Sequence, residues 1–106
     1  MTSTEEIKIL NDAARCSFFG CQILVTQGVQ SLGNLVGVLE AVRSYSTFDK
    51  SNDPYDEHDF GSFTFAGEQL FWKFDYYDVD LQMASPDPTD PTVTVRVLTI
   101  MLAEEY

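Results

Sequence analysis

The sequence predicts a single α+β domain, with two to three helices packed against a small antiparallel sheet of about four strands. Its 106 residues provide enough side chains for one hydrophobic core and not for two. Apolar residues recur at every third or fourth position in some segments and at every second position in others, as expected for helices and strands of one domain. No repeat or linker divides the chain, so we expect residues 1–106 to form one domain with the order α-β-α-β-β-β-α.

The first half of the chain predicts a helix, a strand and a second helix. Ser3-Thr4-Glu5-Glu6 has the form of a capping box with Ser3 as the N-cap, so the first helix runs to about Arg15. The apolar, β-branched run of residues 21–26 has the length of a strand. A second helix, capped by Ser31, is indicated by an apolar stripe at helical spacing: Leu32, Leu35, Val36, Leu39 and Val42.

An acidic loop over residues 47–61 leads into a predicted antiparallel meander. Residues 62–65 and 70–76 have the period-two pattern of strands, and Ala66-Gly67-Glu68 between them is typical of a hairpin turn. The apolar positions shift by one after Tyr77. This shift predicts a bulge or a turn near Tyr77, followed by a third strand over residues 79–83.

The end of the chain supports two interpretations. A second acidic loop, at about residues 84–91, is rich in proline and cannot continue a strand ladder. Asp90 followed by Pro91 is a favoured helix start, and we therefore expect a terminal helix over residues 92–105. The β-branched residues 93–95 make a strand the competing interpretation. Helical spacing favours the helix, through Val97, Leu98, Met101 and Leu102.

Negative charge is concentrated in two segments. The chain has six basic and seventeen acidic side chains, a formal net charge of −11. Residues 49–59 hold five acids and one base, and residues 75–90 hold five acids and no base, so together they carry −9 of this charge. Direct binding to nucleic acid needs clustered Lys and Arg and is therefore disfavoured, whereas a basic protein or a cation is favoured as partner. Solubility alone is the other interpretation.

The composition also indicates a cytoplasmic protein that does not bind a membrane. No run of about 18 apolar residues is present, and the first residues lack the basic and apolar regions of a secretory signal. Cys16 and Cys21 are expected to be reduced, partly buried thiols, because a disulfide scaffold of this size carries more cysteines. We expect no cofactor and no metal, and either a monomer or a homodimer.

The densest group of possible ligands or acid–base residues contains Asp53, Glu57 and His58. Lys73 and Asp75, two apart on a predicted strand, could approach His58 and complete a small metal-dependent or acid–base enzyme. No nucleophile elbow or phosphate-binding glycine loop accompanies them. We therefore favour a structural role, in which the loop acids form side-chain-to-backbone turns and His58 bonds a carboxylate or carbonyl.

The residues expected to contact a partner lie in or beside the two acidic loops, where carboxylates would imitate a row of phosphates and aromatic rings would supply rigid contact area. They are Asp49, Asp53, Asp56, Glu57, Asp59, Asp78, Asp80, Asp87, Asp90, Tyr55 and Tyr77. On this hypothesis the protein is a non-enzymatic inhibitor that occupies the basic site of a nucleic-acid-binding protein. A structural or assembly subunit with an exposed apolar patch is a further hypothesis.

Several motifs resemble one bacterial family, known as domain of unknown function 3768. They are Asn52-Asp53-Pro54-Tyr55 with Glu57-His58-Asp59-Phe60-Gly61, the segments 72–78 and 96–103 with Glu105-Tyr106, and also Leu10-Asn11-Asp12 and Thr26-Gln27-Gly28-Val29. The resemblance implies no established activity and no catalytic residues. It implies a setting on plasmids, prophages and other mobile elements, near antirestriction-like genes. It therefore favours an antagonist of a host-defence complex, of the anti-CRISPR or antirestriction kind.

Overall fold

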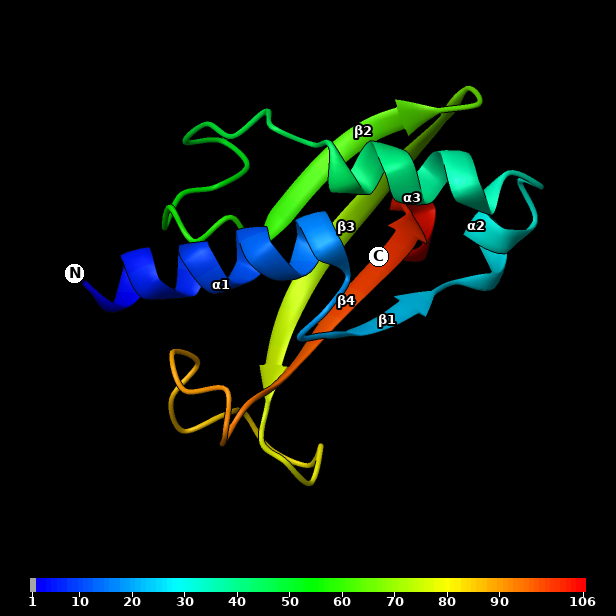
Figure 1. Cartoon of the computed structure of the whole chain (residues 1–106). Coiled ribbons are helices and arrows are strands. Elements are labelled where there is room, and N and C mark those ends of the chain that lie inside the picture. Colours follow the sequence, from blue (N-terminus) through cyan, green and yellow to red (C-terminus); the bar gives the residue numbers. More distant parts are fainter. Residues whose placement is uncertain (1) are drawn as a thin grey trace.

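A computed structural model describes residues 2–106 as one four-stranded sheet with helices across one face (Figure 1). The elements, in chain order, are α1 (Ser3–Ser17), β1 (Gln22–Val25), α2 (Gln27–Gln30), α3 (Leu35–Arg43), β2 (Phe60–Phe65), β3 (Glu68–Tyr77), β4 (Val95–Leu102) and the 3₁₀ helix η1 (Ala103–Glu105). The strand order in the sheet is β1-β4-β3-β2. The α+β class, the four strands and the expected order of element types are confirmed.

The sheet is mixed, which corrects the expectation of a purely antiparallel one. β2 pairs with β3, and β3 with β4, in antiparallel directions, whereas β1 runs parallel to β4 along its other edge. Two helices and the β2–β3 hairpin separate β1 from β4 in the sequence. No tight turn therefore forces these two strands to run in opposite directions.

The core lies between the helices and one face of the sheet. Leu70, Trp72 and Phe74 alternate along β3 and are at most 4% exposed. They pack with Leu98 and Ile100 of β4 and with three apolar helix residues, Ala14, Val38 and Val42. Since successive strand residues point to opposite faces, Lys73 and Asp75 lie on the face that the helices leave open.

Residues 95–102 form a strand, so the expectation of a helix over residues 92–105 is wrong. β4 lies between β1 and β3 and is the most buried strand on both faces. A strand buried on both faces has a nearly continuous apolar sequence, and such a run also matches helical spacing. Asp90 does not start a helix. Its carboxylate accepts hydrogen bonds from the Thr92 amide and hydroxyl in a local turn, and the chain then enters β4.

Residues 79–83 do not form the expected third strand of a meander. The chain turns at Asp78, whose carboxylate accepts a hydrogen bond from the Gln82 amide at 3.0 Å, and Leu81 has a positive φ of 58°. The turn expected near Tyr77 is therefore present. The shifted apolar residues Val79 and Met83 are 61% and 71% exposed, so their alternation reflects an exposed turn.

The helix starts are displaced from those expected. Thr2 caps α1 in place of Ser3, and its hydroxyl accepts a hydrogen bond from the Glu5 amide at 3.2 Å. The second long helix, α3, is capped by Asn34 and not by Ser31, because Gly33 with a φ of +79° separates it from the short α2. The hairpin turn between β2 and β3 is confirmed at Ala66 and Gly67, where both φ angles are positive. None of the helices described within residues 2–106 has the length and apolar character needed to cross a membrane.

A buried polar network joins α1 to the sheet. Asn11 is fully buried, and its amide nitrogen donates to the Glu57 carbonyl at 3.0 Å and to the Tyr76 hydroxyl at 2.8 Å. Its amide oxygen accepts from Nε of Arg96 at 2.9 Å. Arg96, 4% exposed, also donates to the Pro88 carbonyl and lies 5.2 Å from the centre of the Tyr76 ring. Burial raises the pKa of Tyr76, so its hydroxyl remains a neutral donor and acceptor.

Replacing Asn11 by Ala is expected to lower the free energy of unfolding by about 3 kcal/mol, because the buried Arg96 and the Glu57 carbonyl would each lose a partner. Urea unfolding followed by circular dichroism measures this loss. Ile9→Ala is the control on the same helix, since Ile9 is 50% exposed and should change the stability by less than about 0.5 kcal/mol. Equal losses in the two variants would contradict a stabilising role for the network.

Candidate functional site

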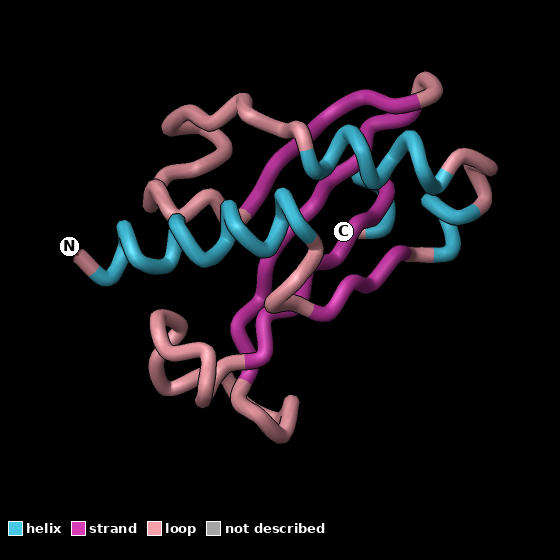
Figure 2. Tube along the Cα trace, in the orientation of Figure 1, coloured by secondary structure: helices cyan, strands magenta, loops and turns pink. Residues whose placement is uncertain are grey.

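The two acidic segments lie at the same end of the sheet. Asp75 belongs to β3, so from here on the second segment means its loop, residues 78–90. We call the region formed by residues 49–59 and 78–90 the acidic end. The first segment leads into β2 and the second leaves β3, and these two strands are antiparallel neighbours. In Figure 2 both segments are loops, and the N-terminal half of α1 runs between them. The pair formed by Asn11 and Arg96 bonds to both segments. Asn11 donates to the backbone carbonyl of Glu57 in the first, and Arg96 donates to that of Pro88 in the second. The network therefore fixes both segments relative to α1.

The acidic residues expected to contact a partner differ in exposure. Four of them are exposed: Asp49, Asp56, Asp80 and Asp87. Four more are half-buried: Glu57, Asp59, Asp78 and Asp90. Asp53 is only 6% exposed and cannot present its charge to a partner. Of the two tyrosines, Tyr55 is 75% exposed, whereas Tyr77 is half-buried on the open face of the sheet.

Local hydrogen bonds keep some of these carboxylates ionised and burial opposes the ionisation of others. Hydrogen bonds from Ser51 and Asn52 lower the pKa of Asp49, and those from Thr92 lower the pKa of Asp90. Burial raises the pKa of Asp59 and Glu57, and neighbouring carboxylates add to this effect. Asp49 and Asp90 therefore retain their charge to lower pH than an ordinary aspartate.

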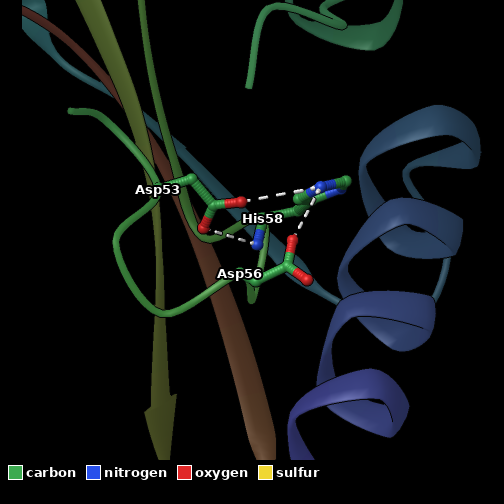
Figure 3. Close-up of side chains that lie close together, drawn as sticks. All are labelled: Asp53, Asp56 and His58. Atoms are coloured by element: carbon green, nitrogen blue, oxygen red, sulfur yellow. Dashed lines mark hydrogen bonds and ion pairs between the residues drawn. The ribbon is translucent and has the colours of Figure 1, made fainter. Parts of the chain in front are cut away.

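A histidine–carboxylate cluster lies within the first acidic segment, at its contact with α1. Figure 3 shows the carboxylates of Asp53 and Asp56 directed toward the imidazole of His58. His58 Nε2 lies 3.5 Å from Oδ2 of Asp53 and 3.8 Å from Oδ1 of Asp56. On the other side of the ring, Nδ1 lies 2.8 Å from Oδ1 of Asp12 in α1. Both ring nitrogens of His58 therefore face carboxylates.

The loop holds this cluster through backbone contacts and ring stacking. Oδ1 of Asp53 accepts hydrogen bonds from the amides of Glu57 at 3.0 Å and His58 at 3.1 Å. Asp56 and His58 both have positive φ angles, 56° and 54°, which turn their side chains back toward Asp53. The His58 ring stacks on Phe48 at 3.7 Å between centroids. The expected structural role of these residues, turns within the loop and a His58–carboxylate contact, is thus present.

The structure does not bring the five residues of the enzyme hypothesis into one centre. His58 stacks on Phe48, which in turn contacts Trp72 on the helix-covered face of the sheet. Lys73 and Asp75 form an ion pair with each other on the open face, and Asp75 raises the pKa of Lys73. Asp53 and His58 are together, whereas the Glu57 carboxylate instead accepts from the Tyr76 hydroxyl at 3.2 Å.

The sequence did not identify Asp12 as a member of the histidine–carboxylate cluster. It also did not identify Asn11 and Arg96 as the pair that bonds the two acidic segments. Asn11 carries a detectable signal, because it lies four residues after Ile7 and three before Ala14, on the apolar face of the first helix. A polar residue at such a position requires a buried partner. Asp12 gives no comparable signal, since a half-exposed acid on a helix is ordinary.

The two cysteines are free thiols. Cys16 is an exposed thiol and Cys21 is half-buried, with a pKa raised by burial.

A family model described as "Protein of unknown function (DUF3768)" matches residues 25–105. Neither the curated proteins nor the solved structures gave a match to the chain.

Replacing Asp59 by Asn is expected to stabilise the protein at pH 7 and to have no such effect at about pH 3. Because its pKa is raised in the folded state, this carboxyl contributes stability only when protonated, and that contribution is lost as the pH rises through the folded-state pKa. Urea unfolding at the two pH values measures the difference.

Replacing Asp49 by Asn, in the same segment, is expected to change the free energy of unfolding in the opposite direction. Hydrogen bonds lower the pKa of Asp49, so its contribution to stability is present at pH 7 and is lost as the pH falls through the folded-state pKa. This variant should be less stable than the parent protein at pH 7, and the difference should shrink as the pH falls below about 4. A shift of both variants in the same direction at pH 7 would show that these pKa differences do not govern their stability.

Proposed function

The chain belongs to the DUF3768 family, and from this premise we propose that it is a non-enzymatic acidic binding protein whose acidic end occupies the basic site of a nucleic-acid-binding protein. The mobile-element setting that the family resemblance implies makes a host-defence complex the partner we propose. Inhibition would then follow from competition with nucleic acid, as in an antirestriction or anti-CRISPR protein.

The observation that carries this proposal is the exposure of carboxylates on two segments that one network holds in place. Asp49 and Asp56 project from the first segment, and Asp80 and Asp87 from the second. The Asn11–Arg96 pair bonds the backbone of both segments. Fixed charges lose less conformational entropy on binding than charges on flexible loops. An array of this kind can imitate the phosphates of a nucleic-acid strand.

The charge balance of the acidic end supports a basic partner. Lys8 lies within this region and pairs with Asp56 at 3.2 Å, and Arg96 is buried beneath it. Neither cation neutralises the exposed carboxylates of the second segment. A field of one sign over a surface accelerates association with an oppositely charged partner, and salt screens this attraction.

The chemistry of the first segment supports a role without catalysis. Lys73 and Asp75 neutralise each other on the face of the sheet away from His58, so they supply no acid or base to the His58 cluster. Asp53 uses one carboxylate oxygen to hold two loop amides. These contacts stabilise the shape of the loop and leave the exposed carboxylates as its accessible chemistry.

A variant with three fewer negative charges at the acidic end tests the proposal. Asp49→Asn, Asp80→Asn and Asp87→Asn together remove three exposed charges but keep the carbonyl oxygens that accept hydrogen bonds from Ser51 and Thr89. The immobilised parent protein should capture a nucleic-acid-binding protein from host lysate, and duplex DNA or RNA should release it. The variant should capture about tenfold less, and capture by the parent should fall steeply between about 50 mM and about 200 mM salt.

A matched variant controls for net charge. Glu40, Glu68 and Glu104 are exposed residues outside the acidic end, and their replacement by Gln changes the charge of the protein by the same amount. This control should capture the partner as the parent does. An equal loss of capture in both variants would show that capture depends on the net charge of the protein and not on the acidic end. If duplex DNA or RNA does not release the captured protein, the acidic end does not occupy its nucleic-acid site.

A further inference from the structure

Three potential metal-ligand atoms converge in the His58 cluster. Nε2 of His58, a carboxylate oxygen of Asp53 and a carboxylate oxygen of Asp56 all lie within 4.8 Å of one another. They face a hollow of about 380 Å³ that is also lined by Phe48 and Lys50. Figure 3 shows the two carboxylates on the same side of the imidazole edge.

The distances are too long for direct hydrogen bonds and suit a shared cation. A charged N–H···O bond measures about 2.7–2.9 Å, whereas Nε2 lies 3.5 Å from Asp53 and 3.8 Å from Asp56. Ligands 2.0–2.2 Å from a tetrahedral metal ion are separated from each other by about 3.3–3.6 Å. A small inward movement of Asp56, which is 67% exposed, would bring the third atom to that spacing.

The protein also orients these ligands. Asp12 lies 2.8 Å from Nδ1 of His58 and favours the tautomer with the proton on that nitrogen. The lone pair of Nε2 then points toward the two carboxylates. A carboxylate on the far nitrogen of a metal-binding histidine is the usual arrangement around zinc.

The Asp53 carboxylate is buried and has one oxygen without a backbone donor. Its side chain is only 3% exposed, and its Oδ1 is held by the amides of Glu57 and His58. Within the part of the chain that the structure describes, the polar contact of its Oδ2 is the 3.5 Å approach to Nε2. Oδ2 of Asp53 is therefore the oxygen available to a cation that also contacts Nε2.

We propose that Asp53, Asp56 and His58 bind a divalent cation of the zinc class and thereby fasten the first acidic segment. One imidazole and two carboxylates suit zinc or cobalt better than magnesium or calcium, which prefer oxygen ligands alone. Asp56 keeps its second oxygen for Lys8 of α1 at 3.2 Å. The bound ion would thus connect the loop, through Asp12 and Lys8, to two turns of α1. Asp56 belongs both to this site and to the exposed carboxylates of the acidic end. The test of metal binding uses the isolated protein, so its outcome does not depend on the proposed partner.

Zinc and cobalt titrations of the purified full chain test the proposal. Calorimetry with Zn²⁺ should give one site per chain, and Zn²⁺ should raise the melting temperature. Asp56→Asn should weaken Zn²⁺ binding by at least about tenfold, and Asp12→Asn by about tenfold through loss of ring orientation. Asp80→Asn, an exposed residue of the second segment with the same change of charge, should leave the affinity unchanged.

Cobalt provides a readout of ligand type and guards against a site at the thiols. Co²⁺ bound by nitrogen and oxygen ligands should show visible d–d bands without the near-ultraviolet band of a thiolate ligand. Absence of Zn²⁺ binding, a thiolate band, or equal affinity in Asp56→Asn and Asp80→Asn would overturn the proposal. His58→Gln should also lose the site, and circular dichroism of each variant verifies its fold, so that lost binding is not mistaken for unfolding.

Discussion

The hydrogen bond between Asn11 of α1 and Arg96 of β4 supports the largest number of other features. It joins two buried polar side chains from opposite ends of the chain. Each then bonds the backbone of one acidic segment, Asn11 at Glu57 and Arg96 at Pro88. Two segments rich in carboxylates repel each other, and a buried guanidinium between them offsets part of that repulsion. The geometry of the acidic end therefore depends on this pair.

The same helix positions the histidine cluster. Asn11 points into the protein, and the next residue, Asp12, points about 100° around the helix toward His58. Arg15, one turn later, lies 3.5 Å from Asp12 and donates to the carbonyls of Val42 and Arg43. α1 is thus tied to α3, to the sheet and to the first acidic segment. Rotation of this helix would disturb the acidic end and the cluster together.

Local patterns predicted what local interactions determine. The β2–β3 hairpin and its turn at Ala66 and Gly67 follow from the alternation of residues and from turn chemistry, and the structure contains both. The strand β4 was not predicted by such patterns. A strand buried on both faces lacks the alternation of apolar and polar residues that would distinguish it from a helix. The density of ligands around His58 was visible in the sequence. The contribution of Asp12 was not, since it depends on a contact between residues 46 positions apart.

The central place of β4 also determines when the fold can form. Both partner strands, β1 and β3, precede β4 in the chain, and β1 has no other neighbour in the sheet. During synthesis, β1 emerges before β4 and cannot pair until residues 95–102 have been made. The four-stranded sheet therefore assembles only after β4 has left the ribosome. Until then, the β2–β3 hairpin is the part of the sheet that can form by itself, because its two strands are adjacent in the sequence.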